Sequence, residues 1–231
     1  MRKKLIYLYV FMQVCINAQT PFEIIRKNIV SSNHQNSLSI IDSCLKVQYQ
    51  IDSSMYYKGL VYIKNNNIKL ATKQCITLHK KYPNFYEVHY LNGLISFSQN
   101  KFFKSVSEFS KIIKINPKDP KALYNRSIAY GKLEDYDDAI ADLDSCLKIN
   151  PNYEMAHYSR AYWLEYLGKY KEAIEDYQIV IRMDPMNFEA YFGLAYLFKI
   201  LKEKDKACDV INNAILMGSQ IATELKESFC Q

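Results

Sequence analysis

The sequence contains little glycine and proline and no block of like charges. Six residues of each type occur among 231, too few for a Gly/Ser-rich linker or a Pro-rich low-complexity segment. Hydrophobic residues make up 49% and aromatic residues 14% of the chain, a content that is too high for intrinsic disorder. The composition therefore predicts a folded chain, long enough for one or two ordinary domains.

The motifs of common enzyme classes are also missing. We find no phosphate-binding P-loop, GxGxxG, GxSxG, HExxH or CxxC pattern. The acidic stretch EDYDDAIADLD distributes its carboxylates around a helix, which does not form a calcium-binding loop. The sequence therefore predicts no catalytic residue, no cofactor and no metal site, and we expect the protein not to be an enzyme.

The charge balance gives no reason to expect a nucleic-acid partner. The formal net charge is +6, and no stripe of Lys and Arg with interleaved aromatic residues marks a surface for a polyanion. The lysines at 101–118 are interpreted as a solvated helix face.

The first residues are typical of an export signal. Arg2, Lys3 and Lys4 precede a largely apolar run over 5–16, which is too short to cross a bilayer as a helix. Residues 1–18, with cleavage after Ala18, are predicted to be a signal peptide; the alternative is an amphipathic or buried first helix. We therefore expect an exported protein that is periplasmic, envelope-associated or secreted, with membrane association possible but not through a transmembrane helix of the mature chain.

Five cysteines remain after removal of that segment, and an odd number argues against a disulfide framework. Four of them fall near core positions, where they would act as small apolar residues: Cys44, Cys75, Cys146 and Cys208. Cys230, near the end of the chain, is the candidate for a reactive thiol.

The dominant feature of the chain is a repeat of 34 residues. YGKLEDYDDAIADLDSCLKINP at 130–151 returns as LEYLGKYKEAIEDYQIVIRMDP at 164–185. Such a fixed period predicts a repeat array. Five copies covering 52–219 begin at Asp52, Tyr86, Pro120, Glu154 and Phe188.

Within each copy, apolar residues recur at intervals of three and four, which predicts two amphipathic helices separated by a short turn. Small residues occupy place eight on the first helix and place twenty on the second, as close antiparallel packing requires. Place twenty-four carries a larger side chain that would fill the adjacent space. The small residues are Gly59, Gly93, Ser127, Ala161 and Ala195 on the first helices, and Ala71, Ser105, Ala139, Ala173 and Ala207 on the second.

These positions resemble the tetratricopeptide repeat, which has an aromatic residue near place seventeen, Ala at twenty and Pro at thirty-two. Tyr136, Ala139 and Pro151 match this pattern in the third copy. The fifth copy departs from it, with Lys204 and Ser219 instead of the aromatic residue and the proline. The resemblance implies an all-α, right-handed α-solenoid of helix-turn-helix repeats. Residues 19–51 would be an N-terminal cap or a degenerate repeat, and 220–231 a C-terminal capping helix.

The same resemblance implies a concave groove, lined by the first helices, that binds protein or peptide segments. Place five is aromatic in every copy, and tyrosines follow at place nine in the last two. An aromatic residue at place five can equally pack between neighbouring helices. Asn125 would hold the backbone of a bound peptide. The candidate binding residues are Tyr56, Tyr90, Tyr124, Asn125, Tyr158, Tyr162, Phe192 and Tyr196.

We therefore expect a non-catalytic, exported scaffold that binds protein or peptide segments within a cell-envelope complex. Place nine is apolar or tyrosine in every copy, so the Lys, Asn and Arg group that grips a C-terminal carboxylate in related arrays is missing. A partner segment of lower charge is predicted. The alternative is a groove whose tyrosines bind a glycan or cell-wall polymer.

Overall fold

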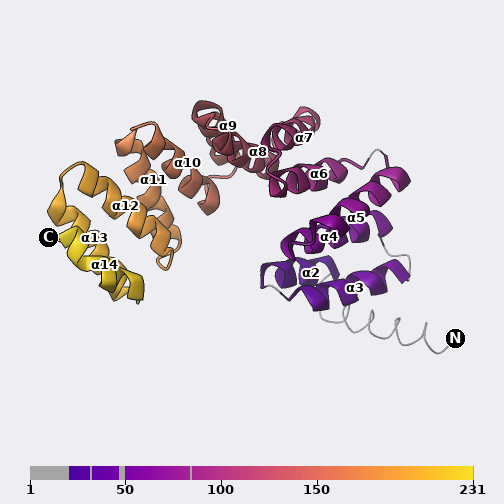
Figure 1. Ribbon diagram of the computed structural model, residues 1–231, viewed down its shortest axis with the longest axis horizontal. Helices are drawn as coiled ribbons and strands as arrows, with labels where there is room; N and C mark the ends of the chain where they lie inside the picture. Colours follow the sequence, from indigo (N-terminus) through magenta and orange to yellow (C-terminus); the bar gives the residue numbers. More distant parts are fainter. Residues whose placement is uncertain (1–20, 32, 47–49, 84, 231) are drawn as a thin grey trace. The chain divides into compact units, whose positions relative to one another are not determined.

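The computed structural model describes residues 21–31, 33–46, 50–83 and 85–230 (Figure 1). These residues form thirteen α-helices and no β-strand, which confirms the all-α prediction. None of the helices described is long and apolar enough to span a membrane. The predicted signal peptide, residues 1–18, lies outside the described residues.

The chain divides into two compact units, which meet in sequence after Ile112. In the first unit each helix packs on its neighbours in the chain, as α2–α3, α3–α4, α4–α5 and α5–α6. The packing of consecutive helices is the arrangement expected of a repeat array. The helices are α2 (Pro21–Val30), α3 (His34–Lys46), α4 (Ile51–Lys64), α5 (Ile68–Lys81), α6 (Glu87–Ser98) and α7 (Phe102–Ile115), the last of which crosses the division.

The second unit continues the same pattern from residue 113. Its consecutive helices pack in pairs, and the first helix of each pair also contacts the first helix of the next: α8 with α10, and α10 with α12. These three helices therefore form one continuous layer. The helices are α8 (Pro120–Lys132), α9 (Tyr136–Ile149), α10 (Glu154–Tyr166), α11 (Tyr170–Met183), α12 (Phe188–Ile200), α13 (Lys204–Leu216) and α14 (Gln220–Cys230).

The turn inside each pair has the same backbone conformation throughout. One residue in each turn has a positive φ, and these residues recur every 34 positions: Asn66, Asn100, Glu134, Gly168 and Lys202. This left-handed conformation suits glycine and is tolerated by asparagine. Only the fourth copy has glycine there, so Glu134 and Lys202 adopt it at an energetic cost.

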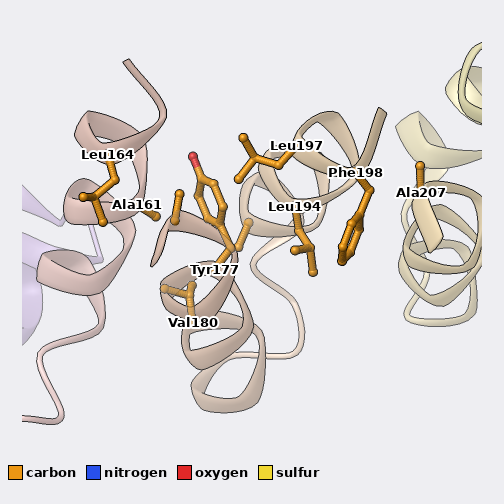
Figure 2. Packing of buried hydrophobic residues seen from close by; sticks show 10 residues of the cluster. Ala161, Leu164, Tyr177, Val180, Leu194, Leu197, Phe198 and Ala207 are labelled. Carbon is orange, nitrogen blue, oxygen red and sulfur yellow. The ribbon is translucent and has the colours of Figure 1, made fainter. Parts of the chain in front are cut away.

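Close helix packing follows from the small residues, as the sequence predicts. All ten at places eight and twenty are buried, and so are the five larger side chains at place twenty-four. In the second unit Tyr177 is one of these. Figure 2 shows its ring between Ala161 and Leu164 of α10 and Leu194 and Leu197 of α12. One large side chain on α11 thereby fills the space left by small residues on its neighbours.

A column of ion pairs inside the helix pairs was not predicted from the sequence. Arg126 donates to both carboxylate oxygens of Asp142, with N–O distances of 2.7 Å. One repeat later, Arg160 binds Asp176 in the same way, and His157 Nδ1 lies 2.7 Å from the same carboxylate. These side chains tie the first helix of a pair to the second near its buried face.

The interpretation of the last two cysteines was wrong. Cys208 of α13 and Cys230 of α14 form a disulfide, so Cys230 is not a free reactive thiol. The odd cysteine count was misleading because α14 folds back beside α13 and brings together two residues of adjacent helices. Cys44, Cys75 and Cys146 are buried, as expected of small apolar residues.

Candidate functional site

The candidate site lies on the layer formed by α8, α10 and α12 in the second unit. On α10, Tyr158, Tyr162 and Tyr166 follow one another at intervals of four residues and so project from nearly the same face of the helix. The rise of an α-helix places the first and last of them about 12 Å apart along the axis. The sequence thus sets a line of three tyrosines along one helix.

A hollow of about 250 Å³ lies at the N-terminal end of that line. Tyr124 of α8 and Tyr158 of α10 line it, and Ser159 lies beside Tyr158. The remaining lining residues come from the starts of α10 and α12: Glu154, Met155, Asn187 and Glu189. Two of the predicted place-five aromatic residues are therefore brought to one concave feature.

The hollow is held in shape by capping and ring contacts. The side chain of Asn187 accepts a hydrogen bond from Ala190 N at the start of α12, and its Nδ2 donates to Glu154 Oε1 at 2.8 Å. The ring of Tyr124 packs on that of Tyr153, with centroids 5.2 Å apart. These contacts connect α8, α10 and α12 around the hollow, so its walls are preorganised.

Exposed tyrosine surface continues toward the C-terminal end of α10. Tyr162 and Tyr166 are 37% and 55% exposed, and their hydroxyl oxygens lie 3.0 Å apart. Both rings contact Trp163, which in turn stacks on Tyr136. A second, smaller hollow of about 150 Å³ follows, lined by Glu165, Tyr166, Tyr170, Tyr196 and Ile200. Tyr196 is 48% exposed.

The surroundings of Tyr158 and Tyr162 make their phenols weaker acids than an ordinary tyrosine. Burial, assisted by the carboxylates of Glu189 and Glu165, raises the pKa of Tyr158. The hydrogen bond with Tyr166, followed by burial, raises the pKa of Tyr162 to about 12. Both side chains therefore remain neutral hydroxyls at physiological pH, able to donate and accept hydrogen bonds.

Two further predicted residues of this unit have less surface to offer. Phe192 is partly buried against the cluster that contains Tyr191, Ala195 and Ile211. Asn125 Nδ2 donates to the carbonyl of Lys121 one turn earlier in α8. This bond uses one Nδ2 hydrogen, so the backbone of a bound peptide would be contacted through Oδ1 or the second hydrogen.

The two remaining predicted residues belong to the first unit. Tyr56 is half-buried and makes edge contacts with the rings of Tyr57 and Phe85. Tyr90 is buried, with its ring edge-on to Phe109 of α7. At Tyr90 the alternative interpretation holds, because the place-five ring packs between neighbouring helices.

The sequence argument missed the polar residues of the first hollow. Glu154 and Glu189 occupy the first turns of α10 and α12, where acidic residues are ordinarily explained by the helix dipole. Met155 and Glu189 both stand at place two of the repeat, on the first helix. Comparing that place across copies could have found these two residues, but it does not include Glu154, which stands at place one.

No group of three or more metal-ligating side chains occurs within the described residues. His89 and His157 each pair with one carboxylate, of Glu108 and Asp176, at 2.7 Å. Each pair joins the first helix of a helix pair to the second.

Family models match two segments of the chain. A model described as "Tetratricopeptide repeat" matches residues 120–153, which are the bounds of the third predicted copy, and one described as "TPR repeat" matches 166–199. The chain is a tetratricopeptide repeat protein. The second match begins at the last residue of α10 and covers α11 and nearly all of α12.

Solved structures share the fold at low sequence identity. PilF of Pseudomonas aeruginosa matches with a TM-score of 0.70 and 13% identity over 90% of this chain and 96% of its own. YrrB, described as a protein with an unusual peptide-binding site, matches with a TM-score of 0.61 and 16% identity over 79% of this chain and 96% of its own.

A shorter match has higher identity. The first tetratricopeptide domain of Spaghetti (RPAP3), solved with an HSP90 peptide, is 28% identical over 51% of this chain and 93% of its own, with a TM-score of 0.50. No curated protein sequence matches the chain.

Proposed function

We propose that this tetratricopeptide array is a non-catalytic, exported scaffold that binds protein or peptide segments along the layer of α8, α10 and α12, within a cell-envelope complex. The observation that carries the proposal is the exposed tyrosine surface of α10, beside a preorganised hollow on the same layer. Tyrosine supplies large apolar contact area with one polar end, at a low cost in conformational entropy.

Two of the structural matches support the proposal that the array binds a peptide. YrrB is described as having a peptide-binding site, and the domain of RPAP3 was solved with the peptide SRMEEVD. Both share the helical architecture of this chain.

Two features support export. The basic and apolar start of the sequence is typical of a signal peptide. Independently, the Cys208–Cys230 disulfide is a bond that forms and persists mainly in oxidising compartments. Cell fractionation with thiol labelling tests export. The chain is expected outside the cytoplasm, with Cys208 and Cys230 oxidised.

We also propose that α2 and α3 form a degenerate sixth repeat and that α14 is a cap. Ser37 of α3 is buried and precedes Ala71 by one period. The Lys58–Asp42 ion pair stands three periods before Arg160–Asp144. At the other end Lys199 Nζ donates to the carbonyl of Ser228 in α14.

The alternative of glycan binding rests on the exposed rings of Tyr162, Tyr166 and Tyr196, because sugars stack on aromatic faces. Photocrosslinking in the native cell separates the two proposals. A crosslinkable residue at position 158 or 162 is expected to capture a protein, whereas capture of polysaccharide would favour the alternative. Position 103 is the control, since Phe103 is 78% exposed on α7 and lies outside the layer. Equal capture from 103 and 162 would contradict both proposals.

A further inference from the structure

The hollow at the start of α10 and α12 has a lining with a defined charge. Glu154 and Glu189 both line it, and its lining includes no Lys, Arg or His. Within the described part of the chain, neither carboxylate takes part in an ion pair. Glu154 Oε1 accepts a hydrogen bond from the neutral amide of Asn187. The charge of both carboxylates is therefore available to a ligand.

The other walls suit a cation with an apolar stem. The rings of Tyr124 and Tyr158 line the hollow from adjacent helices, and aromatic faces attract cations. Met155 adds a flexible apolar surface. Glu189 lies near enough to Tyr158 to help raise the pKa of its hydroxyl, after burial itself. Ring and carboxylate thus surround the same space.

The volume of the hollow matches a single side chain. Pockets for drug-sized molecules span about 300–1,000 Å³, and this hollow, at about 250 Å³, is smaller. Resting on the proposed function, we propose that the hollow receives an arginine or lysine side chain of the bound segment. Its stem packs on Met155 and the two rings, and its charged end lies beside Glu154 and Glu189. Arginine is the better fit, because its planar guanidinium stacks on tyrosine and pairs with carboxylates.

The line of tyrosines on α10 predicts a second residue of the bound segment, beside the basic one. Tyr166 lies about 12 Å along α10 from Tyr158, a distance that three or four residues of an extended segment cover. The bound segment therefore carries an apolar or aromatic residue three or four positions from its basic residue, placed against Tyr162 and Tyr166.

A random peptide library displayed against the immobilised full chain tests this inference. The peptides enriched by the wild-type chain, relative to a Tyr162→Ala/Tyr166→Ala variant, are expected to share the basic residue and the apolar residue at that spacing. The best peptide is then synthesised in two forms, with arginine or its uncharged analogue citrulline at the basic position. Fluorescence anisotropy measures the affinity of the chain for each form.

Citrulline is expected to weaken binding by about tenfold, in the range of one charge-assisted contact. A Glu154→Gln/Glu189→Gln variant is expected to bind both peptides equally weakly. Glu172→Gln is the matched control: Glu172 occupies the first turn of α11 but does not line the hollow, and its affinity is expected to equal that of the wild type. Circular dichroism verifies that each variant is folded.

Enriched peptides without a basic residue, or equal binding of the arginine and citrulline peptides, would overturn the inference and leave the proposed function standing. No enrichment over the Tyr162→Ala/Tyr166→Ala variant would overturn the proposed function and the inference together.

Discussion

At the residue scale, Asp176 connects two first-helix side chains to α11. Its side chain is 2% exposed and takes hydrogen bonds from Arg160 and His157. Arg160 also reaches Asp144 of α9, at 2.6 Å. Arg160 of α10 therefore joins α11 through Asp176 and α9 through Asp144.

Replacing Asp176 with alanine is expected to destabilise the second unit strongly, because Arg160 and His157 would lose their shared acceptor. Removing one partner of a buried ion pair costs about 3–5 kcal/mol. Chemical unfolding followed by circular dichroism measures the change. The control is Asp137→Asn: Asp137 is 89% exposed and 3.9 Å from Lys169, and a surface pair contributes about 0–1 kcal/mol. Similar losses in the two variants would contradict this account.

The same carboxylate gives a pH dependence. Burial acts to raise the pKa of Asp176, but the hydrogen bonds and charges of Arg160 and His157 outweigh it, so the pKa lies below its usual value. A carboxylate with a lowered folded-state pKa contributes stability that is complete above its unfolded-state pKa of about 3.9 and is lost as the pH falls through the folded-state value. Acid unfolding of Asp176→Asn should therefore be less steep below about pH 4 than that of the wild type. Parallel acid-unfolding curves would refute this expectation.

At the scale of the helix pair, the turn residues offer a gain in stability. Glu134 has φ 65° in the turn between α8 and α9, and the left-handed region costs a non-glycine residue about 1–2 kcal/mol. Glu134→Gly is expected to raise the free energy of unfolding by about 0.5–1 kcal/mol, after the entropy that glycine adds to the unfolded chain.

Thermal unfolding measures this gain. Glu134→Ala is its control, since alanine keeps the Cβ atom and should give no comparable increase. Gly168→Ala, at φ 69° in the equivalent turn, is expected to lose stability even though nothing lies within 4 Å of its added Cβ. A stable Gly168→Ala chain would show that the backbone conformation is not the cause.

Gly131 is needed for a different reason, because a helix of the next repeat packs directly against it. A Cβ at this position would lie 2.2 Å from Cζ2 of Trp163, which is buried. Gly131→Ala is expected to displace the indole ring and to destabilise the chain by about 1–3 kcal/mol, a cost typical of overpacking. Trp163 is the sole tryptophan of the sequence, so intrinsic fluorescence reports its displacement directly.

Gly59→Ala is the control, because the nearest atoms to its Cβ are the mobile ends of Leu91, the first at 2.8 Å. The helix preference for alanine, about 1 kcal/mol, should offset that contact. An unchanged emission spectrum in Gly131→Ala would contradict the packing argument.

The fold was predictable from the sequence because its signals repeat. A small residue at places eight and twenty in all five copies predicts closely packed helix pairs, and these residues are buried in the structure. The ion pairs were missed because their repeat position varies between copies. Place seven is arginine in the third and fourth copies, Arg126 and Arg160, but Lys58 and Asn92 in the first two. The hollow was only partly predictable, since Glu154 and Glu189 meet through the approach of α10 and α12 and not through spacing in the chain.

At the scale of the molecule, each helix depends on the packing of its neighbours for stability. In a repeat array, stability is close to the sum of single-repeat and nearest-neighbour contributions. α14 packs on α13 and, through Phe229, on the clusters of α12. Ile221 and Leu225 of α14 are exposed. The disulfide adds a covalent link to a helix that packing covers only in part.

Reduction of Cys208–Cys230 is therefore expected to loosen α13 and α14 selectively. Closing a loop of 22 residues contributes about 3 kcal/mol through the entropy of the unfolded chain. Hydrogen exchange with and without reductant measures the loss of protection, and Cys230→Ser should reproduce it under oxidising conditions. The amides of α8 and α9 are the internal control, because nearest-neighbour coupling leaves them unaffected. Cys75 and Cys146 should not react with alkylating agents in the folded chain, since burial raises the pKa of each thiol to about 11. If reduction instead exposed α8 as much as α14, the unit would unfold as one cooperative body and the disulfide would stabilise all of it.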